Sequence, residues 1–126
     1  MKRLWLGAGL AAILLALGIW TSISISTMEN AIAGTLETAA EEALSGNFQT
    51  ATTLVKSAHS QWEDSWHRIA VIADHAPMDE IDSLFAQVLI YAETGSPGEF
   101  AAHCQRISKL IIAVGEAHAF NWWNLL

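Results

Sequence analysis

The segment between His59 and Asp82 contains the residues best suited to chemistry. It holds three histidines and several carboxylates, and it is interrupted by Pro77. Imidazole nitrogens and carboxylate oxygens are ligands for divalent metal ions. Because the residue before a proline avoids helical angles, the chain should turn here and bring these groups to one helix junction. The candidate metal ligands are His67, Asp74, His75, Glu80 and Asp82.

The spacing of these residues matches no established metal signature. The sequence has no HExxH motif, no paired cysteines and no EF-hand loop. A plainer interpretation is that Glu63 and His67, four residues apart, form a surface pair. The acidic residues after Pro77 would then stabilise the positive end of a helix. We therefore expect no cofactor, and keep the metal site as the alternative.

Signs of catalysis are weaker still. No serine lies in a nucleophile elbow, and no glycine-rich loop after a strand could hold a phosphate. Asp74 and His75 are an acid and a base, but adjacent residues in a loop before a proline usually point apart. We expect no catalytic residues and no enzyme activity.

The tryptophans offer three interpretations. Trp62 and Trp66 share one helical face, and Trp122 and Trp123 lie near the end of the sequence. Large aromatic side chains fill cores well, anchor protein interfaces, and settle at the boundary between lipid and water. The candidates for a partner or membrane contact are Trp62, Trp66, Trp122, Trp123, Leu125 and Leu126.

Charge and cysteine content exclude some classes of protein. The net charge is −7, and only four of the six basic residues follow residue 26, whereas all thirteen acidic residues do. A domain this acidic should not bind nucleic acid. The single cysteine, Cys104, cannot form an internal disulfide, and we expect it in the core.

The start of the chain predicts a membrane anchor. The stretch Leu4 to Trp20 carries no charge, and Thr21 to Ile25 extends it past the ~20 residues that span a bilayer. Lys2 and Arg3 precede it and should remain in the cytoplasm. The expected division is a cytoplasmic tip and anchor at residues 1–26, followed by an extracytoplasmic domain at residues 27–126.

A cleaved signal peptide is the alternative to an anchor. Ser22-Ile23-Ser24 is a poor copy of a cleavage site, and the apolar stretch is longer than usual for a signal. Trp5 and Trp20 lie near its two ends, as in the aromatic belts of membrane helices. These features favour the anchor.

Apolar residues beyond the anchor recur at helical spacing. They predict helices over about 27–45, 48–73, from Pro77 to about 93, and 98–119. Ser26 to Glu29 reads as a capping box at the start of the first helix, although that helix could also continue directly from the anchor. The expected fold is all-α, with a transmembrane helix followed by a small four-helix antiparallel bundle or a tetratricopeptide-like array of helical hairpins.

Several stretches of the chain resemble an uncharacterised bacterial family. They are Lys2-Arg3-Leu4-Trp5, the run from Asp74 to Asp82, and the run from Glu116 to Leu126 with its Asn-Trp-Trp-Asn-Leu-Leu ending. The family they resemble is domain of unknown function 4363. The resemblance implies a short, membrane-anchored helical protein of Gram-positive-type bacteria. It brings no known activity, cofactor or site residues.

These observations lead to an expected function. We expect an accessory protein in which a single membrane helix presents a helical domain that docks on an integral membrane protein. A metal- or ligand-binding sensor domain at the membrane surface is the alternative. Self-association through the apolar seam of the last helix is a third possibility. The seam residues advance by steps of four and three: Phe100, Cys104, Ile107, Ile111, Val114 and His118.

Overall fold

The computed structural model describes the backbone of residues 1–69 and 76–124. It also describes their side chains, except at positions 22, 25, 66–69, 76–77 and 117–124. This part of the chain is all-α, as predicted, and contains no strand. The helices are α1 (Lys2–Leu44), α2 (Phe48–Ile69), α3 (Ala76–Thr94) and α4 (Pro97–Asn124).

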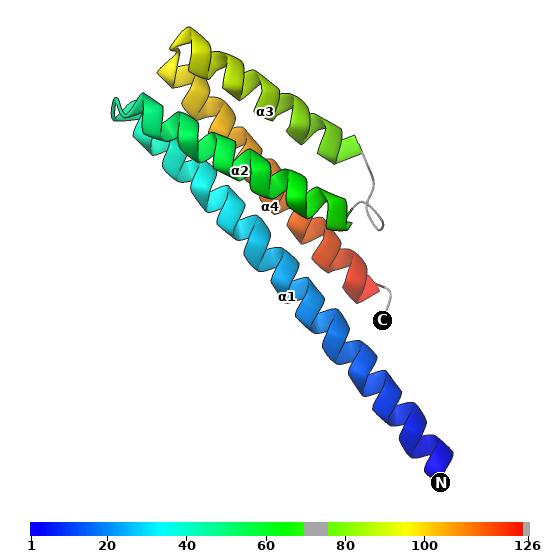
Figure 1. The fold of residues 1–126 in the computed structure, drawn as a ribbon. Helices are drawn as coiled ribbons and strands as arrows, with labels where there is room; N and C mark the ends of the chain where they lie inside the picture. The colour runs from blue at the N-terminus through cyan, green and yellow to red at the C-terminus, as the bar shows by residue number, and fades with distance from the viewer. Residues whose placement is uncertain (70–75, 125–126) are drawn as a thin grey trace.

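The first helix runs unbroken from the apolar start into the folded domain (Figure 1). The capping box predicted at Ser26 to Glu29 is therefore wrong, and the alternative of one continuous helix is right. Inside a running helix each amide already has a carbonyl four residues back, so no cap is needed. Thr27 donates instead to the carbonyl of Ile23 at 2.8 Å.

The four helices form an antiparallel bundle. Short turns connect α1 to α2 and α3 to α4 at the same end of it. Helix α1 packs against both α2 and α4, and α3 packs against α4 and α2 (Figure 1). The contact between the first and last helices closes the bundle, whereas stacked hairpins would keep these two helices apart. The structure thus favours the bundle over the hairpin array.

Two glycines make the sharp turns at the far end of the bundle. Gly46 has a φ of 89° and Gly95 a φ of 71°, values that strain any residue with a Cβ. Gly46 thus ends the first helix where the sequence predicted. Other boundaries shift from prediction: α3 begins at Ala76 rather than Pro77, and α4 spans Pro97–Asn124 rather than 98–119. The predicted end of the second helix, near 73, lies outside the described residues.

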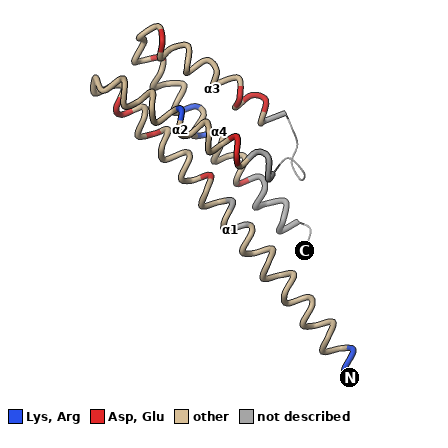
Figure 2. The backbone as a smooth tube through the Cα atoms, in the orientation of Figure 1, with Lys and Arg blue, Asp and Glu red and all other residues tan. Residues whose placement is uncertain are grey.

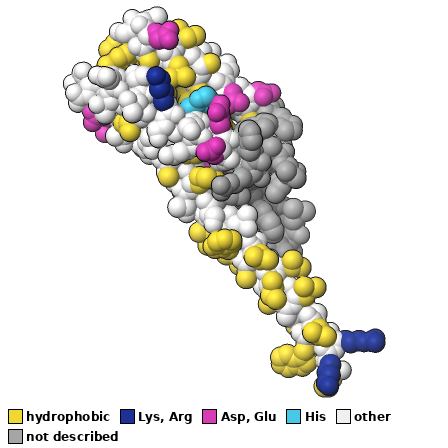
Figure 3. Space-filling model, viewed as in Figure 1, with side chains coloured by type: hydrophobic (Ala, Val, Ile, Leu, Met, Phe, Trp, Pro, Cys, Tyr) yellow, Lys and Arg dark blue, Asp and Glu magenta, His cyan; other side chains and the backbone are white. Residues whose placement is uncertain are grey.

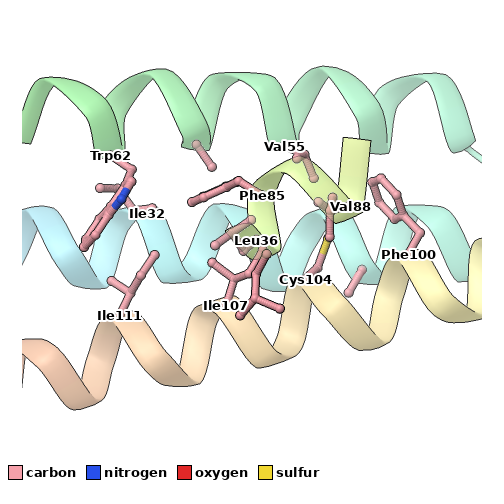
Figure 4. Packing of buried hydrophobic residues seen from close by; sticks show 14 of the residues in the cluster. Ile32, Leu36, Val55, Trp62, Phe85, Val88, Phe100, Cys104, Ile107 and Ile111 are labelled. Atoms are coloured by element: carbon pink, nitrogen blue, oxygen red, sulfur yellow. The ribbon is translucent and has the colours of Figure 1, made fainter. Parts of the chain in front are cut away.

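The core runs along the bundle axis (Figure 4). Phe48 and Phe100 close its far end, with ring centroids 5.2 Å apart. Cys104 is buried, as predicted, and burial raises the pKa of its thiol to about 12. The seam of α4 from Phe100 to Ile111 is also buried. This part of the seam therefore packs inside the bundle rather than on its surface.

The first half of α1 projects beyond the bundle (Figures 1 and 3). Between Lys2 and Thr27 the described side chains are exposed, apart from the partly covered Gly18. Among the described residues α1 is the one helix long and apolar enough to cross a membrane. Lys2 and Arg3 mark its tip, and the acidic residues lie at the opposite end, in the bundle (Figure 2).

Candidate functional site

The predicted metal ligands are only partly described. Glu80 and Asp82 are exposed on α3, and Glu80 pairs with Arg106 of α4 at 3.4 Å. The side chains of His67, Asp74 and His75 lie outside the described residues. No group of three or more histidine, cysteine or acidic side chains could hold a metal ion within the part that is described.

The predicted pair between Glu63 and His67 also involves an undescribed side chain. The carboxylate of Glu63 lies 3.3 Å from His59 Nε2, one turn in the opposite direction along α2. The ring of His59 in turn packs on Phe85 of α3, with centroids 4.9 Å apart. Glu63 therefore belongs to a half-exposed pair that links α2 to α3.

Among the tryptophans, Trp62 is described in full. It is completely buried and packs beside Ile32 of α1 and Ile111 of α4 (Figure 4). The core interpretation thus holds for Trp62, and its assignment as a partner contact is wrong, since it exposes no surface. The side chains of Trp66, Trp122 and Trp123 lie outside the described residues, as do Leu125 and Leu126 altogether.

Glu29 of α1 is the most unusual group in the structure. Its side chain is only 2% exposed, and neither carboxylate oxygen has a hydrogen-bond partner among the described residues. An ionised carboxylate without partners is expensive to bury. Burial accordingly raises the pKa of Glu29 from 4.5 to about 7. Near neutral pH this group can therefore bind and release a proton.

Gly115 of α4 makes room for this carboxylate. A Cβ atom built on Gly115 would overlap Oε2 of Glu29, and its other near neighbours are also atoms of Glu29. The pair lies about one helical turn nearer the start of α1 than Ile32 and Ile111, which pack beside Trp62 (Figure 4). The indole Nε1 of Trp62 also lacks a partner among the described residues. Polar atoms without partners thus gather at this end of the core.

The described charged side chains on the neighbouring helices do not neutralise Glu29. Asp64 on α2 is exposed and borders a hollow with Met28 of α1. On α4, Lys109 and Glu116 are exposed. None of them forms an ion pair with Glu29. Desolvation therefore dominates the raised pKa of Glu29.

Sequence reasoning assigned Glu29 to a cap and missed its burial. A signal was nevertheless present, because Glu29, Ile32, Leu36 and Ala39 advance by steps of three and four, which place them on one helical face. An acidic residue in phase with a core stripe is a candidate for a buried carboxylate. The capping-box pattern hid this signal, because Glu29 belongs both to that pattern and to the buried stripe.

The contact between Gly115 and Glu29 predicts that Gly115→Ala has opposite effects on stability with and without the Glu29 side chain. Gly115→Ala should destabilise the wild-type protein by about 1–3 kcal/mol, because the new methyl group displaces a buried carboxylate. In an E29A background the same change should stabilise by about 0.5–1 kcal/mol, because alanine favours a helix over glycine. Denaturant unfolding of the full chain in detergent, followed by circular dichroism, measures both effects. The same sign in both backgrounds would contradict the contact.

The raised pKa of Glu29 predicts a pH-dependent stability. Below about pH 4.5 the group is protonated both folded and unfolded, so it adds no pH dependence. Between pH 4.5 and 7 the unfolded chain releases this proton first, so stability falls as pH rises, and the loss is complete above 7. The total loss should be roughly 3 kcal/mol.

Two variants isolate the contribution of Glu29. In E29Q the loss of stability between pH 4.5 and 7 should largely vanish. E41Q removes an exposed carboxylate from the same helix and should keep the wild-type profile. Thermal melts over this pH range compare the three proteins. If E29Q and E41Q gave equal profiles, Glu29 would not be the group that titrates.

Comparison with known proteins gives a family and no function. No curated protein and no solved structure matches the chain. A family model described as "Domain of unknown function (DUF4363)" matches residues 19–125. The match covers the end of the apolar stretch and nearly all of the bundle, so it confirms the resemblance seen in the sequence. The chain belongs to the family of domain of unknown function 4363.

Proposed function

We propose that this protein is a membrane-anchored accessory protein whose helical bundle stands outside the cytoplasmic membrane and docks on an integral membrane protein. One observation carries the proposal. Among the described residues nothing covers the apolar first half of α1, and its leucine and isoleucine side chains are about half or more exposed. So large an apolar surface is unfavourable in water and favourable in lipid.

The length of the exposed stretch suits a bilayer. Leu4 to Ile25 forms roughly 33 Å of helix at 1.5 Å per residue. The hydrocarbon core of a bilayer is about 30 Å thick. Trp5 and Trp20, 78% and 69% exposed, lie near the two ends, where an aromatic belt would place them.

Charge supports the proposed orientation. Lys2 and Arg3 flank the start of the anchor, and positive residues favour the cytoplasmic side. All thirteen acidic residues follow residue 26 in the sequence, so the part of the chain beyond the anchor repels anionic lipid. This combination favours a cytoplasmic start and an extracytoplasmic bundle.

The continuity of α1 supports docking within the membrane. No loop separates the anchor from the bundle, so a partner that holds the anchor also fixes the position of the bundle. Gly7 and Gly9 have nothing within 4 Å of where a Cβ would lie. Another helix can approach closely at such positions. These features support a helical membrane partner, with a second copy of the chain as the alternative.

The sensor function predicted as an alternative receives no comparable support. Of its five candidate ligands, the described ones are Glu80, paired with Arg106, and Asp82. Both are exposed on α3, just beyond its first turn. We therefore argue the anchored accessory protein alone.

The anchor is tested by placing charges in its middle. Leu10→Arg with Leu14→Arg should abolish stable membrane integration, because each arginine costs about 2.5–3.5 kcal/mol at the centre of a span. Both leucines are 61% exposed and distant from the core, so the bundle should fold normally. The protein should then wash off membranes at alkaline pH, whereas the control pair Leu10→Ala and Leu14→Ala should resist. Equal resistance of the two pairs would overturn the anchor.

Docking is tested by photo-crosslinking in intact cells. A photoreactive residue replaces each position from Gly7 to Leu17 in turn. We expect protein adducts at positions three or four apart, which mark one face of the helix, and an adduct mass above that of a second 13.7 kDa copy. Adducts at twice the chain's mass would identify self-association instead. Adducts with lipid at every position would overturn docking while leaving the anchor intact.

A further inference from the structure

We propose that the last two turns of α4, which carry Trp122 and Trp123, enter the outer lipid interface beside α1 and give the protein a second contact with the membrane. This inference rests on the proposed membrane anchor. It names the lipid surface itself as the partner of the end of the bundle. The register between α4 and α1, and the composition of the segment that this register brings to the membrane, support this partner.

Two contacts fix the register of α4 against α1. Gly115 meets Glu29, and the hydroxyl of Ser108 donates to Oε1 of Glu37 at 3.2 Å. The helices are antiparallel, so each step forward along α4 is a step back along α1 (Figure 1). For two residues at the same height, one on α1 and one on α4, the sum of the two residue numbers is therefore nearly constant. The two contacts give the same sum to within one. Continued to its end, α4 brings Trp122 level with residues 22–23 of α1, and Asn124 level with residues 20–21.

That height is the outer end of the proposed span. Trp20 and Ile23 are 69% and 59% exposed, and the apolar stretch of α1 ends just beyond them. Of the described helices that pack on α1, α4 extends along it to this level (Figure 1). If Trp20 lies at the interface, the backbone of the last turns of α4 lies there too.

The composition of the end of α4 suits this location. His118 is the last titratable side chain in the sequence, and Phe120, Trp122 and Trp123 follow it. Tryptophan combines a large apolar ring with an N–H donor and is enriched at the level of the lipid headgroups. Asn121 and Asn124 flank the two tryptophans with amides that headgroups and water can satisfy. An uncharged, aromatic segment at this height favours lipid as its partner.

The experiment measures depth in the membrane along α4. The full chain carries Cys104→Ala, which removes the buried thiol, and one new cysteine labelled with a nitroxide in phosphatidylcholine vesicles. The label replaces Asn124 at the end of α4 or Glu116 about 12 Å further from the membrane. Reference labels replace Thr21, at the height of Asn124, and Ser45, at the far end of the bundle. Relative collision rates with oxygen and with a water-soluble nickel chelate report the depth of each label.

We expect the label at position 124 to match the membrane depth of the label at position 21. The labels at 116 and 45 should be freely accessible to the nickel chelate. If 124 is as accessible as 45 while 21 lies in lipid, the second contact is wrong and the anchor stands. If 21 is itself in water, the proposed anchor fails as well.

A second variant tests the role of the tryptophans. Trp122→Ser with Trp123→Ser should move the label at position 124 toward water by severalfold in nickel accessibility, without moving the label at 21. Circular dichroism of the same samples verifies that the helices remain. An unchanged depth at 124 would show that the tryptophans do not hold this end in lipid.

Discussion

Helix α1 is continuous, but its two halves have different surroundings. Its first half is apolar on all sides, whereas its second half is apolar on one stripe that faces α2 and α4. Because no loop separates the halves, the rotation of the apolar half about its axis fixes the direction in which the core stripe points. The other three helices assemble on that stripe, so the bundle depends on this continuity.

The transition between the two environments falls at Glu29. Described side chains before Met28 are largely exposed, and Glu29 is the first buried residue of α1. A carboxyl at this point is tolerated because Gly115 leaves space for it and because its raised pKa lets it carry a proton near neutral pH. The stability of this end of the bundle is thus tied to pH, while the far end is held by Phe48, Phe100 and two glycine turns.

The alignment of α4 with α1 that places Gly115 against Glu29 also determines how far α4 extends along α1. Two contacts set the relative height of α1 and α4. They are the approach of Glu29 to Gly115, which has no side chain, and the hydrogen bond from Ser108 to Glu37. With that height fixed, the length of α4 brings its uncharged end beside the apolar part of α1. The buried carboxyl and the proposed lipid contact therefore have a common geometric cause.

The sequence by itself determined the helical class, the apolar start, the break at Gly46 and the burial of Cys104, whereas it left Trp62 open between the core and a contact surface. These follow from periodicity, charge and backbone preference, which act within a few turns of chain. Only the tertiary structure decided that Glu29 is a core residue rather than a cap, that the seam of α4 is covered by α1, and how the two helices align. Those outcomes depend on contacts between residues some 70 to 90 positions apart, such as Glu37 with Ser108, and no local pattern encodes such contacts.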